Sequence, residues 1–346
     1  MSAVFGCGSR QPAVAWSKPA RVKRFFQSEV GAAVAWVAGS LVLAAVVSPW
    51  LFRAGKHLAF TAEVSAMPAF LEWLGDACGR AKFGRYFNRA MLLSALFLLP
   101  VLLRRIRRLR SAAGLGATDS WSRLSWSSVA VQIVIGCVVA GGMLWGLGAI
   151  LEVAGAYVPK PSPPSLGKLV SKVLIPAVAA SLLEEWLFRG VLLGLWLRVA
   201  RAAAAGIGSA LLFAFLHFLE PPAGTVIADP GQAFAGFRLL GKILLHFTDP
   251  LFFVADFATL LAVGLILAWA RVRTGSLWFS IGLHAGWIIV FKAFNLYYQT
   301  VPGHALYPWG VGESLRSGIL PLVTLGITAA ICHFVLRLFS PARPPV

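Results

Sequence analysis

Long apolar runs dominate this 346-residue chain and restrict the folds that it can adopt. Hydrophobic residues make up 58% of the sequence and charged residues only 13%, against about 25% charged residues in an average soluble domain. Several of the runs approach or exceed the ~20 residues that a helix needs to cross a bilayer. The sequence therefore predicts an all-α, polytopic membrane protein.

The runs predict a bundle of about eight transmembrane helices. Before the second run, "LEWLGDACGRAKFGRYFNR" (residues 71–89) predicts an interfacial helix whose basic residues lie near lipid headgroups. The second run is the weakest, because its apolar part is short and contains Pro100. Residues 220–250 predict a longer loop that can partly re-enter the membrane. The expected spans are residues 31–52, 87–103, 128–151, 169–197, 202–219, 251–270, 277–298 and 318–339.

The net charge of +18 comes largely from basic tracts that flank apolar runs, such as "LLRRIRRLR" (residues 102–110). Such tracts are typical of cytoplasmic loops and attract anionic lipids. Nucleic-acid binding would need a basic folded domain with aromatic platforms, and no soluble segment is large enough. With the N-terminus inside, the densest basic cluster also lies inside. Eight spans then place both termini in the cytoplasm.

The four cysteines are scattered and form no C-x-x-C motif. We therefore expect no disulfide framework and no thiolate metal site. At the N-terminus, the first apolar run is too long for a signal-peptide core and predicts a retained first span.

Ionisable residues stand inside three of the apolar runs: "SLLEEWLFRG" (residues 181–190), "FAFLH" (213–217) and "GLHAGW" (282–287). Such residues are costly in lipid and usually face a bundle interior, where they mark function. The depth of each residue is counted at 1.5 Å per residue from an arginine at the end of its run, namely Arg198, Arg201 and Arg273. Glu184, His217 and His284 then lie about 21, 24 and 16 Å into their helices. The three helices thus deliver a carboxylate and two imidazoles to a similar depth, which predicts a polar cavity within the membrane.

Helix geometry separates the two glutamates. Glu185 and Arg189 are four residues apart and share a helix face, so they can form an ion pair. Glu184 lies about 100° around the helix and is left to face His217 and His284. Each feature alone also has a structural interpretation, because a buried ion pair can be simple packing and a lone histidine is often a hydrogen-bonded core residue. The matched depth of all three favours a functional site.

These segments resemble a known family of membrane proteins. "EEWLFR" fits E-E-x-x-x-R, "FAFLH" fits F-x-x-x-H, and "TGSLWFSIGLHAGW" (residues 274–287) is similar to a third segment whose core is H-x-x-x-N. Their order and spacing resemble the CPBP (ABI) family, which contains type II CAAX prenyl endopeptidases and bacteriocin-processing enzymes. The resemblance covers about residues 170–300.

The resemblance implies an intramembrane endopeptidase. By it, Glu184 activates a water molecule, and His217 and His284 position that water or stabilise the oxyanion. Glu185, Arg189 and the motif residue Phe213 would support the site. The third motif usually has Asn or Asp four residues after its histidine, where this chain has Ile288, which cannot donate to an oxyanion. Ser280, one turn before His284, is a candidate substitute donor.

Several alternatives remain open at this stage. Two histidines and a glutamate also match a catalytic zinc ligand set, although the absence of an H-E-x-x-H motif favours a metal-independent site. A non-proteolytic scaffold, binding or immunity protein is the alternative that Ile288 supports. A proton-coupled transporter is disfavoured, because the sequence lacks a repeated pair of broken helices.

The resemblance also suggests a division of the chain and its setting. The expected substrate is a peptide or lipoprotein in or at the membrane, here a bacterial inner membrane. The predicted parts are a basic cytoplasmic segment (1–30), three N-terminal spans with the interfacial helix and a basic loop (31–165), a CPBP-like catalytic core (166–300), and a last span with a short tail (301–346).

Overall fold

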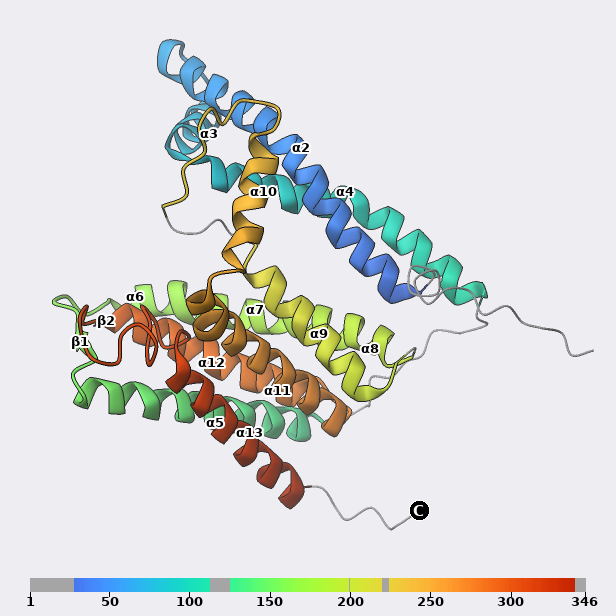
Figure 1. Cartoon of the computed structure of the whole chain (residues 1–346), viewed down its shortest axis with the longest axis vertical. Coiled ribbons are helices and arrows are strands. Elements are labelled where there is room, and N and C mark those ends of the chain that lie inside the picture. Colours follow the sequence, from blue (N-terminus) through green and yellow to red (C-terminus); the bar gives the residue numbers. More distant parts are fainter. Residues whose placement is uncertain (1–27, 113–124, 199, 220–223, 340–346) are drawn as a thin grey trace, which may run out of the picture.

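The computed structural model describes residues 28–112, 125–198, 200–219 and 224–339. These residues form helices and one pair of short strands (Figure 1). The elements are α2 (Glu29–Val64), α3 (Ala69–Arg80), α4 (Phe83–Ala112), α5 (Trp126–Val153), β1 (Tyr157–Pro159), α6 (Leu166–Leu169), η1 (Val170–Leu174), α7 (Ile175–Glu185), η2 (Trp186–Leu192), α8 (Leu193–Trp196), α9 (Ala202–His217), α10 (Ala235–His246), η3 (Phe252–Phe257), α11 (Ala258–Thr274), α12 (Trp278–Tyr297), β2 (Tyr298–Thr300) and α13 (Ile319–Phe339).

Seven helical stretches within the described residues are long and apolar enough to cross a membrane. They correspond to seven of the eight expected spans, and α6 to α8 form one of them as a continuous stretch. The remaining expected span is the shorter apolar helix α9, whose 16 residues extend about 24 Å. The all-α, multi-pass architecture predicted from the sequence is confirmed.

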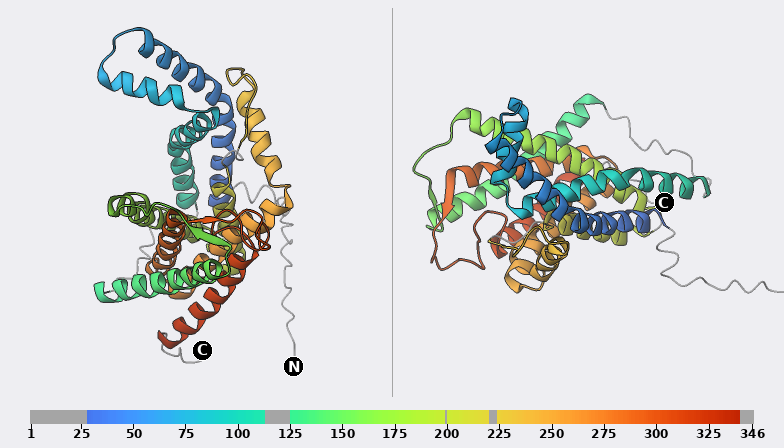
Figure 2. Two further views of the ribbon diagram at one scale, coloured as in Figure 1. Left: turned by 90° about the vertical axis from the view of Figure 1, so that its left-hand side faces the viewer. Right: turned by 90° about the horizontal axis from the view of Figure 1, so that it is seen from above.

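The helices form two groups that α10 connects (Figure 1). In the first group, α2 packs against α3, α4 and α10. In the second, α12 packs against α5 and α7, while α11 packs against α9, α12 and α13. The left view of Figure 2 shows most of the first group projecting away from the second, although α2 contacts α8. The second group holds all three motif segments.

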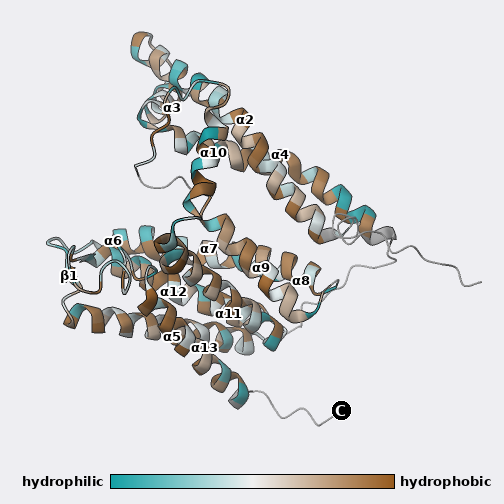
Figure 3. Ribbon diagram, viewed as in Figure 1, coloured by the Kyte–Doolittle hydropathy of each residue, from teal (hydrophilic) through white to brown (hydrophobic). Residues whose placement is uncertain are grey.

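Hydrophobic residues predominate along the helices of both groups (Figure 3), and many of their side chains are exposed. On α4, for example, Leu92, Leu96 and Phe97 are more than half exposed. A long row of such side chains on the outside of an apolar helix is typical of a surface that faces lipid. The chain is an integral, multi-pass membrane protein.

Close packing between α5 and α12 depends on glycines. A Cβ atom on Gly282 would overlap the backbone of Ile133, and one on Gly286 would overlap the backbone of Cys137. Small residues of this kind allow membrane helices to approach closely. The two glycines flank His284, so the "GLHAGW" segment presses the turn that carries this histidine against α5.

The structure corrects two expectations for the connecting segments. The interfacial helix predicted over residues 71–89 is too long, because α3 ends at Arg80 and the extended backbone of Ala81 separates it from α4. The hydroxyl of Tyr86 donates a hydrogen bond to the carbonyl of Cys78 and holds this turn. In the loop predicted at 220–250, the described residues contain α10, which packs against α2.

Candidate active site

A cavity of about 360 Å³ lies within the second group of helices and is lined by several of the residues singled out in the sequence. Its polar lining includes Glu184, His217 and His284, and Ile288 lies on the same wall as His284. Most of the remaining lining is apolar. The lining residues are Leu144, Pro176, Ala180, Glu184, Phe213, His217, Thr259, Leu260, Val263, His284, Trp287, Ile288, Phe291, Lys292, Leu315, Arg316, Pro321, Thr324 and Leu325.

Glu184 lies between the two histidines. Its Oε2 atom is 3.4 Å from Nε2 of His217 and 3.8 Å from Nε2 of His284. The side chains of Glu184 and His217 are each 29% exposed, although the Oε2 atom that faces the histidines is itself buried. Three helices distant in sequence therefore bring one carboxylate and two imidazoles to the same point, as the depth estimate suggested.

Glu185 is enclosed and forms a different set of contacts. One oxygen, Oε1, accepts hydrogen bonds from Nη1 of Arg189 and from the ring nitrogen Nδ1 of His284, each at 2.9 Å. The side chains of Glu185 and Arg189 are both 0% exposed. The ion pair expected from the four-residue spacing is present, but the contact between Glu185 and His284 was not anticipated. Its signal in the sequence was weak, because 99 residues separate the two positions.

The Arg189 guanidinium is held by more than its ion pair. Its Nη2 atom donates to the carbonyl of Gly264 at 3.3 Å. The guanidinium carbon also lies 4.3 Å from the ring centroid of Phe213, within the range of a cation–π contact. These contacts stabilise a buried charge. Arg189 belongs to the π-helical turn η2, which directly follows the two glutamates. Such turns are frequent at functional sites.

The hydrogen bond that each histidine makes through Nδ1 determines which of its two ring nitrogens carries the hydrogen in the neutral state. His217 Nδ1 lies 2.9 Å from the carbonyl oxygen of Phe213, so this nitrogen must carry the hydrogen. His284 Nδ1 faces Glu185, which also accepts from Arg189, and must donate for the same reason. In a neutral ring, each Nε2 therefore presents a lone pair to Glu184. The Glu184 carboxylate and the two Nε2 atoms are then all hydrogen-bond acceptors. A shared proton or a hydrogen-bond donor, such as a water molecule, is needed between them.

Phe213 packs against both histidines. Its ring centroid lies 4.3 Å from that of His217 and 5.9 Å from that of His284. Phe213 is fully buried and also contacts Arg189. Its ring therefore connects the buried ion pair with the two histidines that face Glu184. Its proposed supporting role rests on this packing.

Ser280 and His246 lie elsewhere. The hydroxyl of buried Ser280 donates to the carbonyl of Leu277 at 2.9 Å, and Ser280 does not line the cavity. The ring of His246 packs on Phe252 with a centroid distance of 4.1 Å, outside the cavity lining. The structure thus does not bring Ser280 to the position that Ile288 leaves without a donor.

Two cationic residues in the lining were missed by sequence reasoning. Lys292 lies eight residues after His284, about two helical turns further along the same face of α12, so the spacing could have revealed it. Arg316 comes from the segment before α13 and packs over the rings of Phe218 and Phe291. No local pattern connects Arg316 with the motifs.

The two imidazole nitrogens and the Glu184 carboxylate are chemically a zinc-type donor set. Within the described ranges, no group of three or more His, Cys, Asp or Glu side chains has the arrangement of a metal site. Cys78, Cys137 and Cys332 are free thiols, and Cys7 lies outside the described residues.

The comparison with protein families matches residues 166–290 to the type II CAAX prenyl endopeptidase Rce1-like family. Neither the curated proteins nor the solved structures contain a significant match to the chain. The matched range includes the two glutamates, Arg189 and both cavity histidines. Over residues 166–290, this membrane protein is therefore similar to the Rce1-like family of type II CAAX prenyl endopeptidases.

Proposed function

We propose that the chain is an intramembrane endopeptidase in which Glu184 activates a water molecule for attack on a peptide bond. The observation that carries this proposal is the position of Glu184 in the cavity, with its Oε2 atom 3.4 and 3.8 Å from the two imidazoles. These separations exceed an ordinary hydrogen bond. This oxygen is buried and has no hydrogen-bond partner among the described residues.

In the proposed mechanism, Glu184 takes a proton from the water as its oxygen attacks the carbonyl carbon of the substrate. The resulting carboxylic acid then gives this proton to the leaving amine, and the enzyme returns to its starting state. No covalent intermediate with the protein is formed. The partial exposure of Glu184 is consistent with this role, because the group must meet both water and substrate.

The histidines orient the water and offset the charge that develops on the carbonyl oxygen. Their Nδ1 atoms are fixed by Phe213 and Glu185, so their Nε2 atoms converge on the reacting position. A protonated ring would donate to the oxyanion. Loss of one such donor typically costs about 2.7–4 kcal/mol of transition-state stabilisation.

Glu185 and Arg189 act behind the reacting groups. Both side chains are inaccessible, and the Glu185 carboxylate keeps the His284 ring in one orientation and one tautomer. They are positioning residues, because neither lines the cavity.

A non-proteolytic membrane scaffold is the second candidate function, and Ile288 favours it. The Ile288 side chain lines the cavity at the position where the family that this chain resembles usually has a polar donor. Ser280 does not supply that donor, because its hydroxyl is bonded to the carbonyl of Leu277. A scaffold would use the same apolar cavity to hold a hydrophobic peptide without cleaving it.

The test compares the purified wild type with Glu184→Gln, His217→Ala and His284→Ala on a fluorogenic peptide library that includes isoprenylated peptides. Cleavage by the wild type and its loss in all three variants are expected. Retained cleavage by Glu184→Gln would refute the assigned base. Bound metal is measured on the same samples, because a stoichiometric metal would replace the metal-independent mechanism. Peptide binding without cleavage by the folded wild type would support the scaffold.

A further inference from the structure

A second cavity, of about 750 Å³, lies in the first group of helices and shares no lining residue with the active-site cavity. Its walls come from α2, the α3–α4 turn, the start of α4 and the segment from Gly224 to Leu239. Four cationic side chains line it, and no carboxylate does. The four are Lys56, Arg80, Lys82 and Arg85.

The four cations differ in how they are compensated. Lys56 donates to the carbonyl of Gly79 at 2.5 Å, and Arg80 forms an exposed ion pair with Asp76. Within the described part of the chain, the side chains of Lys82 and Arg85 have no hydrogen-bond or ion-pair partner. The cavity therefore holds an excess of positive charge next to two uncommitted donors.

Along both long helices of this group, the sequence changes between apolar and basic residues at the level of the cavity. On α2, the apolar residues up to Phe52 are followed by Arg53 and Lys56, and on α4 the basic first turns are followed by the apolar stretch 90–103. These changes place the cavity at the boundary between hydrocarbon and headgroups. The exposed rings of Phe70 and Trp73 on α3, 6.0 Å apart, fit the same depth.

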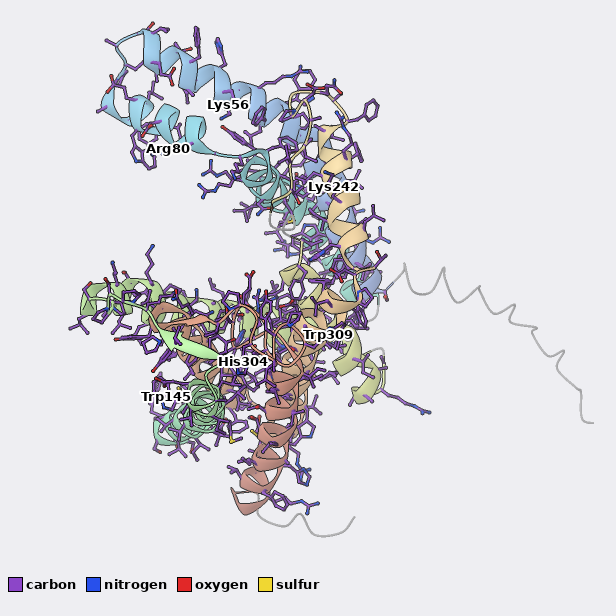
Figure 4. The ribbon with its side chains drawn as sticks, turned by 60° about the vertical axis from the view of Figure 1, so that its left-hand side comes forward. Lys56, Arg80, Trp145, Lys242, His304 and Trp309 are labelled. Carbon is purple, nitrogen blue, oxygen red and sulfur yellow. The ribbon has the colours of Figure 1, made fainter. Side chains whose placement is uncertain are left out.

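The outer wall of the cavity is fixed by α10. Lys242 donates from Nζ to the carbonyl of Val226 at 2.9 Å and thereby holds a lining segment in place. Figure 4 shows Lys56, Arg80 and Lys242 on three different helices in the same part of the molecule. The cavity is thus built from elements that are far apart in the sequence.

Asn88 adds a requirement for a hydrogen-bond donor. Its side-chain oxygen Oδ1 is buried and has no partner among the described residues, and Asn88 lines the cavity. A buried acceptor without a donor is unfavourable. A ligand hydroxyl next to the phosphate would supply the missing donor.

We propose that this cavity binds the headgroup of an anionic phospholipid that carries hydroxyl groups beside its phosphate, as in phosphatidylglycerol. Lys82 and Arg85 contact the phosphate oxygens, and Asn88 accepts a hydrogen bond from a headgroup hydroxyl. A soluble phosphate ester offers the same chemistry, but the depth of the cavity at the membrane boundary favours the lipid. The site is independent of the peptidase chemistry proposed above.

Native mass spectrometry of the delipidated full chain, titrated in detergent with phosphatidylglycerol, tests the site. Lys82→Gln/Arg85→Gln should weaken binding about tenfold or more, since each basic residue near an anionic headgroup contributes on the order of fivefold. Lys168→Gln/Lys172→Gln removes two exposed charges from the second group of helices, away from this cavity, and should change binding less than twofold. Equal weakening by both double variants would overturn the proposal, because it would reflect total charge alone.

Two further arms test the ligand chemistry. Phosphatidylmethanol, which has the same charge and no headgroup hydroxyl, should bind the wild type several-fold more weakly than phosphatidylglycerol, and Asn88→Leu should abolish this difference. Equal binding of the two lipids by the wild type would refute the role of Asn88. Displacement by sn-glycerol 3-phosphate at concentrations similar to those of the lipid would overturn the assignment to a lipid. Near-ultraviolet circular dichroism verifies that each variant is folded.

Discussion

Replacing Glu185 by glutamine preserves the size of the side chain and removes the charge that holds Arg189 and His284. Arg189 is then a buried cation without its carboxylate, although the carbonyl of Gly264 and the ring of Phe213 remain in contact. Breaking a buried pair on one side typically costs about 3–5 kcal/mol. Because these secondary contacts persist, we expect a loss near 3 kcal/mol in the free energy of unfolding.

The double variant Glu185→Gln/Arg189→Met separates stability from catalysis. Methionine removes the uncompensated charge, so stability should return to within about 1 kcal/mol of the wild type. Turnover should stay at least ~100-fold low, because an amide can donate to Nδ1 of His284 and favour the wrong tautomer, as replacement of a carboxylate behind a catalytic histidine does elsewhere.

Unfolding in mixed micelles, followed by tryptophan fluorescence, measures the first effect, and turnover per folded molecule measures the second. Asp76→Asn is the matched control, since it breaks the exposed Arg80–Asp76 pair at the same four-residue spacing and should cost less than about 1 kcal/mol. The reasoning fails if Glu185→Gln alone is as stable as the wild type. It also fails if the double variant turns over at the wild-type rate.

Three other changes have defined outcomes. Ile288→Asn, which adds a donor to the cavity wall, should raise kcat by about tenfold or more; an unchanged kcat would show that no donor is missing there. Gly282→Val, whose Cβ meets the backbone of Ile133, should lower unfolding stability by about 1–3 kcal/mol, whereas Gly142→Ala, with open space around its Cβ, should not. Lys292→Gln should raise KM for peptides with an acidic group beyond the scissile bond and leave KM for neutral peptides unchanged; an equal rise for both would contradict electrostatic recognition.

The membrane architecture could be predicted from the sequence because the apolar runs are long and few kinds of structure other than helices can span a bilayer. The sequence misplaced the boundary between α3 and α4, since the basic residues near Arg85 look interfacial although they begin a spanning helix. The break at Ala81 depends on the bond from Tyr86 to Cys78, a tertiary contact that hydropathy does not report.

The residues of the candidate site were predictable where helix periodicity controls their direction. The four-residue spacing indicated the pair of Glu185 and Arg189, and the common depth indicated that Glu184 meets two histidines. The bond from His284 to Glu185 could not be predicted, because it depends on the rotation of α12 about its axis. That rotation is set by the glycine contacts with α5.

The buried ion pair is a costly way to fill space, since an apolar pair of similar volume often gives equal or greater stability. Two leucine-like side chains at positions 185 and 189 would pack under Phe213, but they could not accept the hydrogen from Nδ1 of His284. The same Glu185 oxygen accepts hydrogen bonds from Arg189 and from His284, so the guanidinium holds the carboxylate in place behind the ring. The pair therefore has a chemical purpose in the proposed mechanism: it fixes His284 with Nε2 directed at Glu184. Glu184 itself, next in the sequence but rotated about 100° around the helix, stays accessible to water.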